Sequence, residues 1–123
     1  NIFFATGTGI APFVSILRDL ESKKEKISVS LYWGNRFEDE FLDLPNYKYI
    51  DLQLHKTLSR KKKDGFYHGY IQDCFAEIES DHQFIMPYIC GSKNMIECVK
   101  NKLINSGYKG IILTDAFVSH TSG

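Results

Sequence analysis

The sequence predicts an α/β fold, a three-layer α/β/α sandwich around a five-stranded parallel sheet. Short apolar, β-rich segments alternate with segments in which apolar residues recur at steps of three and four. Two of the predicted strands end abruptly in glycine turns that open helices. The 123 residues are the length of one domain, and we expect it to span residues 1–117, followed by a flexible tail at 118–123.

The first half of the chain contains three of the predicted strands. The apolar run 2–5 forms a buried strand and leads into a glycine turn. A helix over 10–20 follows, with Pro12 in its first turn, where the missing N–H costs nothing. A β-rich segment at 27–33 stops at Gly34, a short helix is expected within 37–43, and alternation predicts a third strand at 47–55.

The second half begins with a basic loop at 56–63 and a turn at 65–69, followed by a short helix at 71–78. A strand at 87–90 leads to Ser92, a good N-cap residue for a helix that reaches residue 104. Gly107 is placed to terminate that helix. The fifth strand is expected at 111–114.

Composition excludes several classes of protein. Apolar residues make up 43% and charged residues 24%, which is typical of globular domains and not of disordered chains. Fifteen basic residues balance fifteen acidic ones, so no net charge attracts nucleic acid. No apolar run approaches the length of a membrane span. Three widely spaced cysteines fit a reducing compartment, so we expect a cytoplasmic protein without a metal site.

The turn after the first predicted strand carries the strongest chemical signal. It reads Thr6-Gly7-Thr8-Gly9 and is followed by Pro12. Glycines allow the backbone to approach a ligand closely, and the following helix presents free N–H groups at its start. A phosphate or pyrophosphate is the natural ligand, although the same pattern also occurs as a plain strand-to-helix turn.

The end of the second predicted strand lacks a feature of common dinucleotide-binding sites. A dehydrogenase fingerprint needs an acidic residue there to hold the ribose, and Gly34-Asn35-Arg36 provides none. This absence disfavours an ordinary Rossmann dehydrogenase and equally a methyltransferase.

The basic loop offers a possible contact for a second phosphate. It holds five cations and no acid, and Ser59 with Arg60 pairs a hydroxyl with a guanidinium, which suits a phosphomonoester such as the 2′-phosphate of NADP. A solvated loop is the other interpretation, and for Lys61, Lys62 and Lys63 it is the better one. A single short basic loop in a neutral chain does not support nucleic-acid binding.

Three ordered segments resemble the ferredoxin–NADP reductase superfamily, and together they cover nearly the whole chain. They are the glycine turn 2–13, the strand end Tyr32-Trp33-Gly34-Asn35-Arg36, and the segment Tyr88-Ile89-Cys90-Gly91-Ser92-Lys93-Asn94-Met95. The resemblance implies a two-domain flavoprotein, of which this chain is the C-terminal NAD(P)-binding domain. The superfamily's flavin motif Arg-x-Tyr-Ser/Thr is absent, so a barrel holding FAD or FMN is expected upstream.

The resemblance also implies roles for individual residues. NADP is slightly favoured over NAD, because Ser59 and Arg60 match the pair that holds the 2′-phosphate. His68, however, replaces a lysine that is frequent in the family. Tyr70 matches a tyrosine that stacks on adenine, and Met95 fits the core of a helix as well as a ligand contact. The expected nucleotide-binding residues are Thr6, Gly7, Thr8, Gly9, Pro12, Arg36, Ser59, Arg60, Tyr70, Gly91 and Met95.

Three further residues are expected at the reaction centre. Cys90 matches the cysteine beside the nicotinamide, where its position rather than thiol reactivity matters. Asp115 and Phe117 match an acid-x-aromatic pair near the family's C-terminus, with Asp115 assisting the charge balance and Phe117 covering the flavin. Family chains often end at that aromatic residue, whereas this chain continues for six more residues.

The function expected from the residues and the resemblance is hydride transfer from NAD(P)H to a flavin on the missing domain. The electron acceptor would be a ferredoxin, an iron–sulfur domain or an oxygenase. The main alternative is a non-catalytic nucleotide-binding module of flavodoxin-like topology, which would need neither Cys90 nor the Asp115-x-Phe117 pair. A methyltransferase is a weaker alternative.

Overall fold

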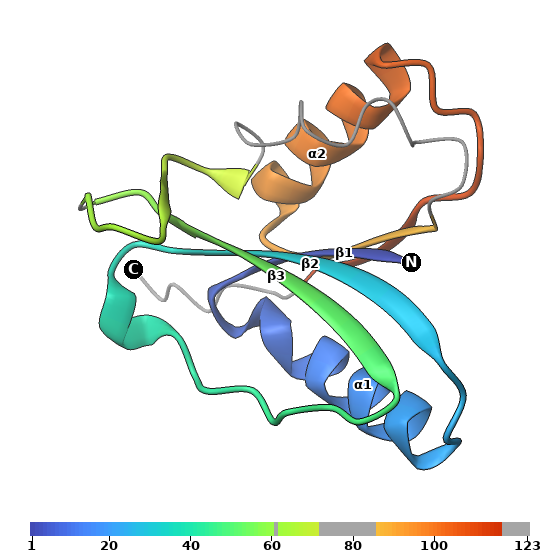
Figure 1. Cartoon of the computed structure of the whole chain (residues 1–123). Coiled ribbons are helices and arrows are strands. Elements are labelled where there is room, and N and C mark those ends of the chain that lie inside the picture. Colours follow the sequence, from blue (N-terminus) through green and yellow to red (C-terminus); the bar gives the residue numbers. More distant parts are fainter. Residues whose placement is uncertain (61, 72–85, 117–123) are drawn as a thin grey trace.

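The computed structural model describes residues 1–60, 62–71 and 86–116 of the chain. In these residues a single parallel sheet has the strand order β4-β3-β2-β1-β5-β6 (Figure 1). Its six strands are β1 (Ile2–Thr6), β2 (Ile27–Asn35), β3 (Ile50–Leu58), β4 (Tyr67–His68), β5 (Pro87–Gly91) and β6 (Leu113–Ala116).

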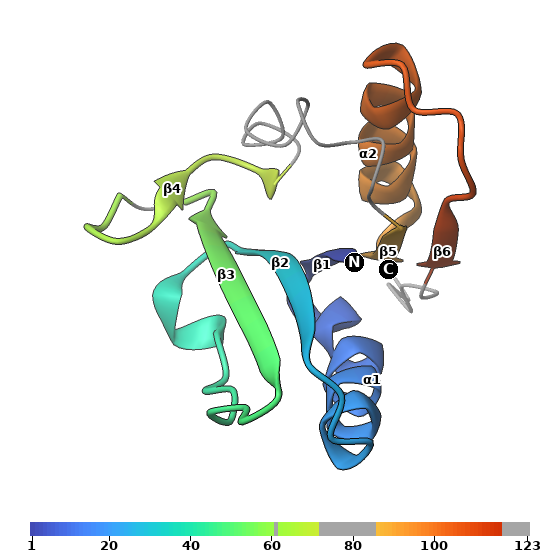
Figure 2. The same cartoon turned by 45° about the vertical axis from the view of Figure 1, so that its right-hand side comes forward.

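Helices cover both faces of the sheet. Helix α1 (Ala11–Ser22) lies on one face and α2 (Lys93–Asn105) on the other, as Figure 2 shows. Two 3-10 turns, η1 (Gly7–Ile10) and η2 (Glu38–Glu40), follow β1 and β2. The predicted α/β/α sandwich is confirmed.

The central strand β1 is buried because both of its faces are covered. Ile2 and Phe4 pack with the residues under α2, whereas Phe3 and Ala5 pack with those under α1. Phe3 stacks on Phe13 of α1 with ring centroids 4.4 Å apart. Successive side chains of a strand point to opposite faces, so an unbroken apolar run is what a strand in a middle layer requires.

The number of strands differs from the prediction of five. The additional strand is β4, which was expected to be part of a turn and pairs with the end of β3 at Thr57 and Leu58. Two residues are too few to display the alternation by which strands are recognised, and both are exposed. The predicted short helix at 37–43 is only the 3-10 turn η2.

Two other boundaries were also wrong. Strand β3 runs to Leu58 and not to residue 55, because it pairs with β2 along its whole length, so the basic segment at 56–63 begins inside the sheet. Strand β6 lies two residues later than expected, at Leu113–Ala116. The helix expected at 71–78 and the tail at 118–123 lie outside the described residues, except for Ile71.

Predictions about the ends of the two helices are confirmed. Pro12 lies in the first turn of α1. The hydroxyl of Ser92 accepts a hydrogen bond from the backbone N–H of Met95 at the start of α2, over 3.3 Å. Gly107 follows α2 with a φ of 102°, a left-handed conformation that glycine adopts easily.

The order of the strands determines where a ligand can bind. From β1 the chain moves to β2 on one side, whereas β5 lies on the other side, so strand order reverses between β1 and β5. The loops after these two strands lead to helices on opposite faces and leave a crevice at the carboxyl edge. The carboxyl ends of β1, β2 and β3 lie at the left of Figure 1.

Within the described part of the chain, neither helix combines the length and the apolar character needed to cross a bilayer.

Candidate functional site

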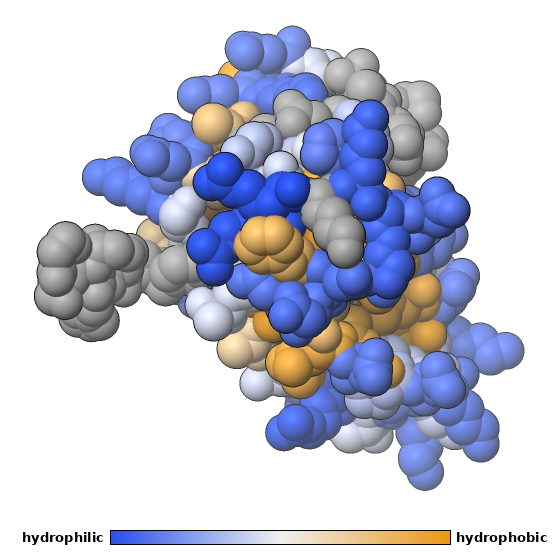
Figure 3. All heavy atoms as spheres, turned by 90° about the vertical axis from the view of Figure 1, so that its left-hand side faces the viewer, coloured by the Kyte–Doolittle hydropathy of each residue, from blue (hydrophilic) through white to orange (hydrophobic). Residues whose placement is uncertain are grey.

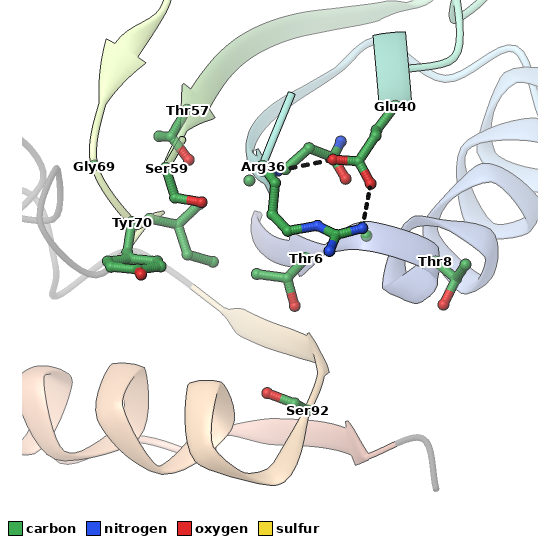
Figure 4. Close-up of a pocket in the computed structure, with 13 residues that line it drawn as sticks. Thr6, Thr8, Arg36, Glu40, Thr57, Ser59, Gly69, Tyr70 and Ser92 are labelled. Carbon is green, nitrogen blue, oxygen red and sulfur yellow. Dashed lines mark hydrogen bonds and ion pairs between the residues drawn. The ribbon is translucent and has the colours of Figure 1, made fainter. Parts of the chain in front are cut away.

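A cavity of about 670 Å³ lies at the carboxyl edge of the sheet. Figure 3 shows the face onto which it opens, where hydrophilic residues surround a smaller hydrophobic group. The close-up in Figure 4 shows side chains from the ends of neighbouring strands around this space. The lining residues are Thr6, Gly7, Thr8, Gly34, Asn35, Arg36, Glu40, Thr57, Ser59, Gly69, Tyr70, Ile71 and Ser92.

The glycine turn after β1 forms one wall of the cavity. Gly7 has a φ of 52°, which side-chain-bearing residues rarely adopt, and the space around it is open. Gly7 and Thr8 are exposed, whereas Gly9 and Ile10 are buried against the protein. The indole N–H of Trp33 donates to the carbonyl of Gly7 over 3.4 Å, so a strand residue supports the turn from behind.

Two other glycines keep the cavity wall close to the backbone. A Cβ on Gly91 would lie 2.5 Å from the Thr6 hydroxyl, and one on Gly34 would lie 2.9 Å from the Thr57 hydroxyl. A side chain at either position would therefore displace a polar group of the wall. The start of α2 adds Ser92 to the wall, so two helical starts, those of η1 with α1 and of α2, face one crevice.

The ends of β2 and β3 continue to pair beyond the strands themselves. The backbone N–H of Ser59 donates to the carbonyl of Asn35, and that of Arg60 donates to the carbonyl of Arg36, both over 3.1 Å. The two arginines therefore lie on adjacent backbones. Arg36 and Ser59 line the cavity, whereas Arg60 is exposed and does not line it.

A carboxylate also lines the cavity, although none stands at the strand end Gly34-Asn35-Arg36 itself. Glu40 lies four positions beyond Arg36, and η2 turns it back so that its Oε2 is 3.2 Å from Arg36 Nη2. Its Oε1 accepts hydrogen bonds from the backbone N–H groups of Phe37, over 2.9 Å, and Arg36, over 3.1 Å. These hydrogen bonds, chiefly the one from Phe37, lower the pKa of Glu40, and the Arg36 guanidinium adds to the effect.

Two buried polar atoms at the cavity wall have no partner within the described residues. They are Nδ2 of Asn35 and the hydroxyl of Thr57, in residues that are 9% and 1% exposed. Unpaired polar groups at a protein surface crevice are typical of sites that bind water or a polar ligand. Hydroxyl groups, a guanidinium and bare backbone on one wall form a donor set that fits a phosphorylated nucleotide.

The structure brings together about half of the predicted nucleotide-binding residues. The cavity is lined by Thr6, Gly7, Thr8, Arg36, Ser59 and Tyr70, but not by Gly9, Pro12, Arg60, Gly91 and Met95. Met95 is 6% exposed and packs in the core under α2. The residues that the sequence analysis missed are Gly34, Asn35, Glu40, Thr57, Gly69, Ile71 and Ser92.

Two of the three residues expected at the reaction centre, Cys90 and Asp115, lie on the two strands beyond the switch point. Cys90 of β5 is directly paired with Asp115 of β6, and Cys90 is buried whereas Asp115 is exposed. Burial, with a smaller contribution from the Asp115 charge, raises the pKa of Cys90 to about 11, so the thiol is protonated at neutral pH. Phe117 lies outside the described residues.

Two cations of the basic segment, Lys56 and Lys63, have partners of their own in the structure. Lys56 Nζ lies over the rings of Phe41 and Phe66, 5.6 and 4.7 Å from their centroids, and Lys63 pairs with Glu38. Lys61 is outside the described residues. In the described ranges, no group of three His, Cys, Asp or Glu side chains is arranged to hold a metal ion.

The chain matches the family model "Oxidoreductase NAD-binding domain" over residues 3–101. The chain belongs to this family. The expected ferredoxin-reductase-like NAD(P)-binding domain is thereby confirmed, and a non-catalytic module of flavodoxin-like topology is not favoured.

Individual members of known function resemble the chain only in part of their length. A CDP-6-deoxy-L-threo-D-glycero-4-hexulose-3-dehydrase reductase of Yersinia pestis is 28% identical over 127 residues, which cover 95% of this chain and 37% of that protein. The chain therefore spans little more than a third of this relative.

Solved structures agree on the fold of this NAD-binding domain. The Amycolatopsis cytochrome P450 reductase GcoB superposes with a TM-score of 0.79 at 22% identity, over 94% of this chain and 37% of that one. The ferredoxin-NADP+ reductase of Plasmodium falciparum, solved with 2′P-AMP, has a TM-score of 0.69 at 25% identity, over 94% of this chain and 52% of that one.

Proposed function

We propose that this domain binds NAD(P)H across the carboxyl edge of its sheet and presents the nicotinamide to a flavin held by another part of the full-length protein. The observation that carries the proposal is the cavity at the switch point between β1 and β5, with the left-handed Gly7 on its wall. When bound, the nucleotide supplies hydride chemistry, and the protein supplies position and electrostatics.

The pyrophosphate would lie against the turn of Thr6, Gly7 and Thr8. The start of η1 lies on the cavity wall, where its backbone N–H groups would be donors to a ligand, and the two threonine hydroxyls would add donors. Gly9 and Pro12 act indirectly, since one allows close packing behind the turn and the other starts α1 without an unsatisfied N–H. Gly91 keeps the opposite wall free of a side chain.

The adenosine end would lie near β3 and β4. Tyr70 is 55% exposed and lies beside Ser59 at one side of the cavity (Figure 4), where its ring can stack on adenine. Ser59 and Arg60 would bind a 2′-phosphate, with Arg36 on the adjacent backbone, so NADP would be preferred over NAD. The 2′P-AMP bound by the Plasmodium falciparum reductase supports this assignment.

The nicotinamide end would lie at the carboxyl ends of β5 and β6. Cys90 would act by position, because its raised pKa keeps the thiol neutral beside the uncharged ring. Asp115 lies next to it in the sheet and would balance charge, and Phe117 would cover the flavin.

The remainder of the protein would provide a barrel that binds FAD or FMN, N-terminal to this domain. The domain itself would extend to residue 117. Electrons would pass from the flavin to a ferredoxin, an iron–sulfur domain or an oxygenase. The anthranilate 1,2-dioxygenase electron transfer component of Acinetobacter baylyi, 28% identical over 112 residues, supports an acceptor of the last type.

A binding experiment with the 123-residue chain tests the proposal. Thermal shift and isothermal titration should show stabilisation by NADP+, weaker stabilisation by NAD+, and none by S-adenosylmethionine. Binding of S-adenosylmethionine alone would overturn the proposal.

Arg60→Glu should lower the affinity for NADP+ about 10- to 100-fold, which is the size of one lost charged hydrogen bond. The affinity for NAD+ should stay nearly unchanged. Lys62→Glu is the matched control, since it makes the same change of charge in the same exposed segment. Equal losses of affinity for both nucleotides would show that Arg60 does not bind the 2′-phosphate.

A further inference from the structure

An acid and a base from the same turn face the cavity beside the proposed 2′-phosphate position. Glu40 and Arg36 both line the cavity together with Ser59, and their side chains are joined at 3.2 Å. In Figure 4 the Arg36 side chain lies between Glu40 on one side and Ser59 and Tyr70 on the other. A phosphate bound near Ser59 would therefore meet a guanidinium that already has an anionic partner.

The carboxylate is the fixed member of this pair. Oε1 of Glu40 is held by the backbone N–H groups of Phe37 and Arg36, at 2.9 and 3.1 Å, within a 3-10 turn. The Arg36 side chain is 66% exposed and would otherwise be free to choose among many rotamers. Its direction is consequently set by Glu40, and the net charge of this part of the wall is close to zero.

The other acids of η2 do not act on the cavity in this way. Glu38 pairs with Lys63 and does not line the cavity, and neither does the exposed Asp39. Within η2, then, Glu40 is the acidic residue at the site. The backbone contact between Arg36 and Arg60 places the carboxylate in the same corner as both arginines.

Resting on the proposed function, we propose that Glu40 is a specificity-determining residue that weakens the preference of this domain for NADP over NAD. It withdraws Arg36 from the 2′-phosphate and adds a negative charge beside that dianion. The neutral 2′-hydroxyl of NAD suffers no such repulsion, and a carboxylate can accept its hydrogen bond. Because Arg36 and Glu40 are paired, Ser59 and Arg60 remain for the 2′ position, and the site can accept both dinucleotides.

The experiment compares Glu40→Gln with the original chain in titrations with NADP+, NAD+ and 2′,5′-ADP at low salt. Glutamine keeps an oxygen that accepts the N–H groups of Phe37 and Arg36 but removes the charge. NADP+ and 2′,5′-ADP should bind about three- to tenfold more tightly, the size of one partly exposed charge contact, while NAD+ stays unchanged or weakens. Asp39→Asn, the matched control, should change each affinity by less than about twofold.

A second variant tests the route through Arg36. Arg36→Gln should lower the affinity for NADP+ only slightly in the original chain and more strongly in the Glu40→Gln background. The reason is that the Arg36 guanidinium is free to bind the phosphate only when Glu40 is replaced. Unchanged affinities in Glu40→Gln, or equal changes for NADP+ and NAD+, overturn the inference and leave the proposed function intact. If the original chain binds neither dinucleotide, the proposed function fails, and the inference fails with it.

Discussion

A Cβ built on Gly9 would stand 2.5 Å from the backbone carbonyl oxygen of Cys90, closer than such atoms can approach. The turn after β1 therefore packs directly on the end of β5, with no side chain between them. These are the two strands between which the strand order reverses. The missing side chain of Gly9 keeps the two walls of the crevice in their observed positions.

Gly9→Ala should therefore destabilise the domain and weaken nucleotide binding together. The colliding atom belongs to the backbone, so the turn must move as a whole, and we expect a loss of about 1–3 kcal/mol in the free energy of unfolding. Urea denaturation measures it. Gly7→Asn is the control for stability alone, because the space around Gly7 is open and asparagine tolerates positive φ. An alanine variant as stable as the original chain would contradict this account.

The single tryptophan should report on the glycine turn. Trp33 is 1% exposed, and its N–H donates to the carbonyl of Gly7, whose outer face lines the cavity. A nucleotide that binds the turn should change the intensity or the wavelength of Trp33 emission, with saturation at the Kd measured by calorimetry. S-adenosylmethionine serves as the negative control. Trp33 emission that remains unchanged at saturating NADP+ would indicate that the nucleotide does not bind at the glycine turn.

Residues adjacent in sequence were the part of the site that the sequence predicted well. Thr6, Gly7 and Thr8 belong to one short motif, whose spacing is itself the signal. The burial of β1 on both of its faces likewise follows from a continuous apolar run between two helical faces. Such local patterns can be read from the sequence because residues that are adjacent in a strand or a turn are also adjacent in the chain.

The missed residues depend on how turns fold back and on which strands become neighbours, and a short sequence motif shows neither. Glu40 reaches the cavity only because η2 folds back on Arg36. A dehydrogenase fingerprint has its acidic residue at the end of the second strand itself, so the fingerprint does not point to Glu40. Thr57 was assigned to a basic loop, yet it pairs with Gly34 in the sheet and is buried. The sequence identifies Ser92 as a helix cap. Its position directly after β5, at the switch point, also indicates a place in the cavity wall.

Tyr70 should contribute a flat surface rather than its hydroxyl. Tyr70→Phe should keep the affinity for 2′,5′-ADP within about twofold, and Tyr70→Ala should lose about tenfold, since stacking on a base requires the ring alone. Calorimetry with 2′,5′-ADP checks both variants. Tyr67 is exposed to a similar degree, 43%, but does not line the cavity, so Tyr67→Ala is the control. Equal losses in both alanine variants would show a general effect on β4 and its surroundings.

The buried Cys90 thiol should make the domain less stable in alkaline solution. Its pKa is raised from 9.0 to about 11 by burial and by the Asp115 charge, so above pH 9 the unfolded chain loses a proton that the folded chain keeps. The unfolded state then binds fewer protons, and stability falls as the pH rises from 9 toward 11. Tyr88, whose pKa is also raised by burial and by the neighbouring Cys90 and Asp115, adds to the fall above pH 10.

Urea denaturation at several pH values measures this fall. Cys90→Ala should reduce its slope and leave only the part of the Tyr88 contribution that comes from burial and from Asp115. Cys98→Ser is the matched control, because that thiol is exposed. Alkylation provides an independent readout. At pH 8 the exposed Cys98 should react with iodoacetamide in the folded chain, and Cys90 should react only after unfolding, as peptide mapping by mass spectrometry would resolve. Rapid alkylation of Cys90 in the folded chain would contradict the raised pKa and the burial on which it depends.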